Sequence, residues 1–157
     1  MFATFTAFLQ SLPAEAVWGI SLFALFSAQV VMIRLFGVAG ACVYCVAAIV
    51  AGNIEALKTV HFASLDWTIP GGTLIFTTTY LATDIVSEQY GRQAARTVVF
   101  SGMAGYLLFT LMMQFSLGYA PLTGEPLAEA TEQGLPNLHK QMHDLFAPMP
   151  AFFFASM

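Results

Sequence analysis

Two acidic side chains near the middle of the chain are the residues best placed to bind a polar ligand. Asp84 and Glu88 lie four residues apart at the end of an apolar stretch, so they would share one face of a helix. An acid inside a membrane helix costs about 3 kcal/mol or more unless it is paired or hydrated, and it therefore normally faces a polar cavity, a substrate path or a proton relay. Asp84 has no basic residue within one helical turn. It is our first candidate for a ligand-binding carboxylate.

A structural interpretation of the same segment stays open beside the functional one. Glu88 precedes Arg92 by four residues, which is the favourable orientation for a helical ion pair. Gly91 is placed to cap the end of that helix. Threonine hydroxyls such as that of Thr83 can bond the carbonyls of their own helix, so a run of them need not line a pocket. The aromatic ring of Tyr90 could stack on a planar ligand.

Asn53 is the deepest polar residue of the preceding apolar stretch, which ends in AGNIEALK. Its amide predicts either a hydrogen bond to another helix or a contact with a heteroaromatic ligand, and the residues favour neither. Glu55 and Lys58 lie closer to the membrane boundary, where the carboxylate can simply be solvated.

Two further pairs have spacings known from metal or redox sites. Cys42 and Cys45 form a C-x-x-C inside an apolar run, where two thiols on one helix face behave as small apolar side chains. His139 and His143 have the i, i+4 spacing of zinc ligands, but no glutamate follows His139 as it does in metalloproteases. We therefore predict no metal and no cofactor.

The elements that would position these residues are membrane-spanning helices. A bilayer core demands about 20 mostly apolar residues per helix. Four stretches meet this demand, at about 16–33, 35–57, 69–86 and 97–119. A polar loop follows at 121–145, with room for a short amphipathic helix, and residues 151–157 read as the start of a fifth helix that is truncated at the C-terminus. The expected fold is an all-α polytopic transmembrane bundle forming one domain over 1–157.

Composition agrees with this fold and excludes other classes. The chain is 58% hydrophobic and only 9% charged, with a net charge of −4, so it cannot cover its own surface with polar groups. It has no basic face for nucleic acid. No nucleophile elbow, phosphate loop or dinucleotide fingerprint is present, so the sequence does not predict an enzyme. The lipid bilayer is the expected partner.

Orientation follows from the positive charges in the short loops. Arg34, Arg92 and Arg96 fall on one side of the membrane, and Lys58 and Lys140 fall on the other. An excess of Lys and Arg marks the cytoplasmic side, so we place the N-terminus outside.

The segment YLATDIVSEQYGRQAAR resembles the signature of the queuosine precursor transporter family, also called the VUT or YhhQ-type family. The upstream segments GNIEALKTV and IPGGTLIFTTTYLATD are similar to the family's asparagine-containing helix and to the helix that follows it. The resemblance implies a multi-pass carrier of the cell inner membrane that imports 7-deazaguanine bases, the purine-like precursors of queuosine in tRNA. It places the family motif on seven positions of this chain: Asn53, Thr83, Asp84, Glu88, Tyr90, Gly91 and Arg96.

Two other functions remain open at this stage. The chain could be a substrate-binding membrane subunit that depends on a separate ATP-driven partner, or a membrane scaffold that transports nothing. The sequence contains no ATP-binding motif, and it leaves self-association into a homo-oligomer open.

Overall fold

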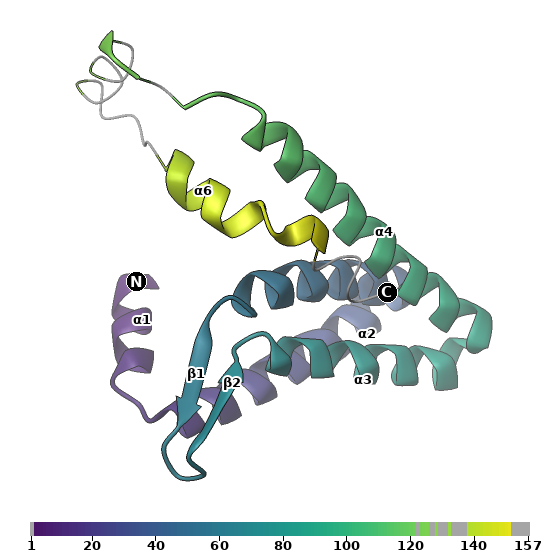
Figure 1. Ribbon diagram of the computed structural model, residues 1–157. Helices are drawn as coiled ribbons and strands as arrows, with labels where there is room; N and C mark the ends of the chain where they lie inside the picture. Colours follow the sequence, from purple (N-terminus) through teal and green to yellow (C-terminus); the bar gives the residue numbers. More distant parts are fainter. Residues whose placement is uncertain (1, 122, 126–127, 129–131, 133–137, 152–157) are drawn as a thin grey trace. The chain divides into compact units, whose positions relative to one another are not determined.

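The computed structural model describes residues 2–121, 123–125, 128, 132 and 138–151 (Figure 1). They form two compact units, which divide between Gly105 and Tyr106. The elements are α1 (Phe2–Gln10), α2 (Ala14–Glu55), β1 (Thr59–Phe62), β2 (Trp67–Pro70), α3 (Thr73–Tyr90), α4 (Arg92–Leu117) and α6 (His139–Phe146).

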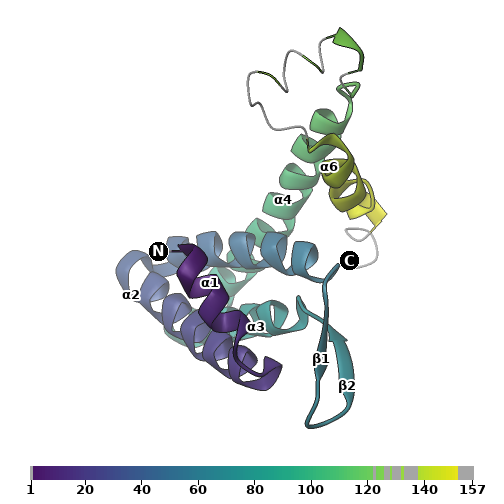
Figure 2. The same cartoon turned by 90° about the vertical axis from the view of Figure 1, so that its left-hand side faces the viewer.

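Helix α2 contains both of the first two predicted helices and is bent at one residue. Gly37 has φ 58° and ψ −137° inside an otherwise helical run, a conformation that only glycine adopts without strain. The chain turns there, and the Tyr44 hydroxyl in the second arm (38–55) lies 3.3 Å from the Leu25 carbonyl oxygen in the first arm (14–36). The boundary between the first two predicted helices, which we expected at Arg34, is therefore at Gly37. Figure 2 shows the two arms from the side.

A β-hairpin that we did not predict follows α2. Strands β1 and β2 are antiparallel, with Thr59 opposite Pro70 and Phe62 opposite Trp67. Its strands are rich in β-branched and aromatic residues, which favour pleated structure. The prediction that a helix starts at Ile69 was wrong, because Ile69 pairs with Val60 in this hairpin.

Helices α3 and α4 meet at a single residue. Gly91 ends α3 with φ 86° and ψ 167°, and α4 begins at Arg92. The predicted cap at Gly91 is confirmed. The fourth helix starts five residues earlier than the expected Thr97, because the positive φ of Gly91, which glycine adopts readily, lets the chain turn within one residue.

Packing in the first unit centres on the contact between α2 and α3. Its buried core joins residues of α2 to residues of α3 and α4. The members are Ile33, Ala41, Tyr44, Cys45 and Ala48 of α2, Ile75, Ala82 and Val86 of α3, and Val98 of α4. Gly72, the residue before α3, lies close to α2, because a Cβ on it would overlap the carbonyl oxygen of Gly52. Cys45 packs as a small apolar side chain, as predicted.

Two helices in the described part of the chain are long and apolar enough to cross a membrane, namely α2 and α4. The chain is thus mainly helical, with apolar helices typical of a membrane protein. The four separate spanning helices expected from the sequence are only partly supported. The first two are merged in α2, and α3 is too polar to be counted with α2 and α4.

In the second unit, α6 packs against the C-terminal half of α4. The Gln114 side chain donates a hydrogen bond of 2.9 Å to the Phe146 carbonyl oxygen, and the rings of Phe109 and Phe146 meet edge to face at 5.9 Å. Helix α6 is the short helix expected within 121–145. Apart from Ala151, the predicted partial helix 151–157 lies outside the described residues.

Candidate functional site

A line of polar side chains runs along the exposed face of α3. The members recur every three or four residues, which places them on one side of a helix; we call them the polar stripe: Thr73, Thr77, Tyr80, Asp84, Ser87 and Glu88. The opposite face is buried against the rest of the unit through Leu74, Ile75, Thr78, Ala82 and Val86. An 18-residue helix is about 27 Å long, close to the roughly 30 Å of a bilayer core. The polar stripe runs from Thr73 to Glu88, about 22 Å along the helix axis.

Asp84 and Glu88 both lie on the polar stripe, so the prediction that they share a face is confirmed. Neither carboxylate has a side-chain hydrogen bond or ion pair to another described residue. In particular, Glu88 and Arg92 do not form the ion pair that their spacing suggested. Both acids are thus available to a ligand or to water.

Asn53 lies far from these acids. It is buried at the end of α2, and its side-chain nitrogen donates to the Ile49 carbonyl of its own helix at 2.8 Å. Because Gly52 touches Gly72 just before α3 begins, Asp84 lies about 16 Å farther along the α3 axis. The structure does not bring Asn53 and Asp84 together.

The threonines of α3 behave as the structural alternative predicted. The hydroxyl of Thr83 donates to the Tyr80 carbonyl at 2.8 Å. Three others donate to the carbonyl three residues earlier in the same way: Thr77, Thr78 and Thr79. Thr83 is half-buried beside the polar stripe rather than on it.

Tyr90 ends α3 at the bend of α2. Its hydroxyl lies 3.5 Å from the position that a Cβ on Gly37 would occupy. The bend and the α3–α4 corner are therefore at the same end of the unit. Arg34, Arg92 and Arg96, all exposed, belong to this end as well, which makes it the positively charged end.

An interhelical polar cluster that we did not predict lies on the buried face of α3. Gln29 is fully buried, and in the amide orientation that satisfies both groups its nitrogen donates to the Thr78 carbonyl at 2.9 Å and its oxygen accepts from the Ala82 N–H at 2.5 Å. These two backbone groups would bond each other in an ordinary helix. The Tyr44 hydroxyl adds a bond to the Thr78 side chain. The sequence offered one signal for this cluster, since Gln29 is the single amide side chain in the apolar stretch 16–33.

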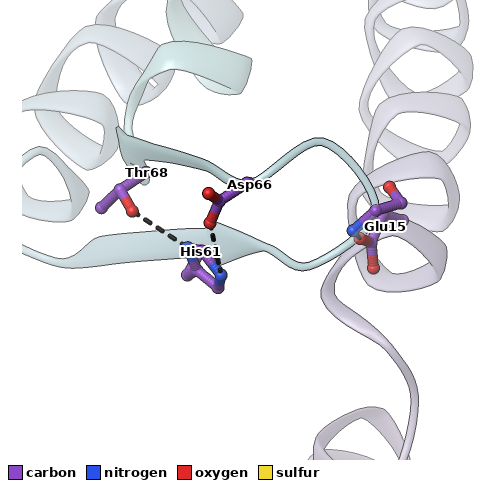
Figure 3. A network of polar contacts seen from close by, with 5 residues as sticks. Glu15, His61, Asp66 and Thr68 are labelled. Carbon is purple, nitrogen blue, oxygen red and sulfur yellow. Dashed lines mark hydrogen bonds and ion pairs between the residues drawn. The ribbon is translucent and has the colours of Figure 1, made fainter.

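The opposite end of the unit carries a second set of polar contacts, shown in Figure 3. The Glu15 carboxylate accepts a hydrogen bond of 2.9 Å from the Ser64 N–H. His61 lies 3.0 Å from the Thr68 hydroxyl and 3.9 Å from the Asp66 carboxylate. The start of α2 and the tip of the hairpin therefore lie at one end, away from the arginines.

Comparison with known proteins shows which family the chain belongs to. Residues 70–157, more than half of the chain, match the family described as "Putative vitamin uptake transporter". The chain belongs to this family. The match includes α3 with its polar stripe, and the resemblance seen in the sequence is confirmed. As a member of a transporter family, the protein is not an enzyme.

A similar curated protein is the "Probable queuosine precursor transporter" of Bacillus subtilis strain 168, which is 33% identical over 97 residues. The aligned region is 62% of this chain but 42% of that relative, so the chain corresponds to less than half of it. No solved structure matches the chain.

Proposed function

We propose that this chain takes part in the import of 7-deazaguanine precursors of queuosine across the cell inner membrane, as a multi-pass member of the transporter family. The observation that carries the proposal is the polar stripe of α3. The carboxylates of Asp84 and Glu88, which no described side chain pairs, are costly to expose to hydrocarbon. They must face water or protein, as the wall of a substrate path does.

The chemistry of the polar stripe suits a purine-like base. A deazaguanine presents a ring N–H and an amino group side by side, and one carboxylate can accept from both. We assign this role to Asp84. Tyr80, whose side chain is 70% exposed one turn before Asp84, is placed to stack on the base. Thr83, Glu88, Tyr90 and Asn53 remain candidates from the family motif, with Gly91, Arg92 and Arg96 as its structural part.

Uptake of a labelled base tests the proposal. Cells that cannot synthesise 7-deazaguanines should accumulate the label only when they express the protein, and unlabelled base should compete while adenine should not. A well-expressed protein that gives no uptake would remove the proposed function.

The same assay separates a self-sufficient carrier from a subunit that needs an ATP-driven partner. Uptake by the purified protein in vesicles without ATP indicates a carrier. Uptake that requires ATP and a copurifying ATPase indicates the subunit.

A further inference from the structure

At the end of the first unit opposite the arginines, an open cavity of about 540 Å³ lies between α1, the start of α2, the hairpin and the first turn of α3. This volume is within the range of about 300 to 1,000 Å³ typical of small-ligand sites. The cavity does not include Asp84 or any other residue assigned above. Its apolar lining comes from Leu9, Leu12, Val17, Val60 and Leu74.

Three larger side chains of complementary chemistry line this cavity: Trp18, Glu55 and Lys58. Trp18 is 40% exposed, and its ring meets that of Phe62 edge to face at 6.4 Å, which restricts the orientation of the indole. Glu55 is the last residue of α2, and Lys58 lies three residues later in the turn before β1. Neither of their side chains bonds another residue of the described chain, so the carboxylate and the ammonium group are both available.

We propose that this cavity is a second, outward-facing binding site for the same class of planar base. This inference rests on the proposed function. A guanine-type edge carries a carbonyl acceptor next to a ring N–H and an amino donor. The Glu55 carboxylate accepts from the two donors, the Lys58 ammonium group donates to the carbonyl, and the Trp18 indole stacks on the ring.

The position of the cavity fits a site of first capture. Leu74, which lines it, lies in the first turn of α3 beside Thr73, where the polar stripe starts. Asp84 lies ten residues farther on, or about 15 Å along the axis. With the arginines on the cytoplasmic side, the cavity faces outward, and the polar stripe leads from it to the opposite end.

Tryptophan fluorescence tests this site directly. In a Trp67→Phe protein Trp18 is the remaining tryptophan, since the chain has two, and Trp67 does not line the cavity. Titration of this protein in detergent with a 7-deazaguanine base should quench Trp18 saturably. Adenine should bind at least about tenfold more weakly, because its six-membered ring has no carbonyl and no N–H.

Matched variants in the same background attribute the quenching to the cavity. Glu55→Gln should weaken binding about tenfold, since the amide replaces one acceptor by a donor. Glu125→Gln should leave the binding unchanged, because it makes the same chemical change at an exposed residue that does not line the cavity. The absence of saturable quenching, or an equal affinity in the Glu55→Gln protein, would overturn the inference.

Uptake distinguishes failure of this inference from failure of the proposed function. If cells import the base although Trp18 does not respond, the second site is wrong and the transport proposal stands. If Trp18 binds the base with the stated dependence on Glu55 but cells import nothing, the cavity site is supported and the transport proposal fails.

Discussion

The hydroxyl of Tyr44 donates a hydrogen bond of 2.7 Å to the side-chain oxygen of Thr78, and both residues are buried between α2 and α3. The Thr78 hydroxyl in turn donates a hydrogen bond of 2.7 Å to the Ile75 carbonyl oxygen. The second arm of α2 is thus linked to the middle of α3 by a polar chain with a defined direction. Such interhelical bonds fix the register of helices whose apolar contacts alone are less specific.

Removing the hydrogen bond between Tyr44 and Thr78 from either side should lower the stability of the protein by a modest amount. Tyr44→Phe and Thr78→Val should each reduce the free energy of unfolding by about 0.6 kcal/mol, and by no more than about 1.7 kcal/mol. The double variant should lose less than the sum, because both changes delete the same bond. Unfolding in mixed micelles measures these values, with the exposed Tyr119→Phe as control. Fully additive losses would show that the two side chains are not coupled.

Replacing Gln29 by a charged residue should destabilise the protein more than replacing it by an apolar residue. In a Gln29→Leu protein the Thr78 carbonyl and the Ala82 N–H can serve each other as helical partners, so we expect a small change in stability. Gln29→Glu should cost about 3 kcal/mol or more at neutral pH, since it buries a carboxylate against a carbonyl. The loss of stability in the Gln29→Glu protein should be smaller at low pH, where the protonated carboxyl group can donate to the Thr78 carbonyl and accept from the Ala82 N–H. Thermal unfolding at pH 7 and pH 4.5 measures this, and equal stability of the two variants at pH 7 would contradict it.

The bend of α2 should depend on glycine at one position. Gly37→Ala should destabilise the protein by about 1 to 3 kcal/mol, because φ 58° with ψ −137° is strained for any residue with a Cβ. A Cβ there would meet only ordinary contacts with Tyr90, so the cost comes from the backbone. Gly19→Ala in the same helix is the matched control. It has open space around it and should be neutral or stabilising by up to about 1 kcal/mol. Equal effects at both positions would argue against a required bend.

The orientation in the membrane can be read with single cysteines. In a protein with Cys42 and Cys45 replaced by alanine, an impermeant thiol reagent added to intact cells should label Ser64→Cys at the hairpin. It should not label Gln93→Cys beside the arginines until the cells are opened. The two sites report opposite ends, since Ser64 bonds Glu15 while Tyr90 lies at Gly37. The reverse labelling pattern would invert the orientation.

Asp84→Asn should separate binding from folding. The amide exchanges one acceptor for a donor, so a base with two adjacent donors meets an unpaired contact worth roughly 1 to 3 kcal/mol, and uptake affinity should fall about tenfold or more. The fold should survive or gain stability, because an amide is cheaper to bury than a charge. Asp66→Asn makes the same chemical change outside the polar stripe and should leave uptake unchanged. Normal uptake with reduced thermal stability would make Asp84 a structural residue.

Local pattern was enough to predict a good part of this molecule. The apolar runs indicated a helical membrane protein, Gly91 indicated the end of α3, and the four-residue spacing of Asp84 and Glu88 placed them on one face. Each of these properties depends on a few adjacent residues and on the period of the helix. The family signature around Asp84 is equally local.

The tertiary structure decided the features that depend on residues far apart in the chain. Helix α2 bends at Gly37. There the Tyr44 hydroxyl contacts the Leu25 carbonyl across the two arms, and Tyr90 packs beside Gly37. Asn53 bonds its own helix and lies far from Asp84, although one motif contains both. The partners of Gln29 are backbone groups about 50 residues later, which no local period reports. Sequence spacing determined which side chains share a helix face, and packing of distant segments determined which faces are buried, bonded to each other or open to a ligand.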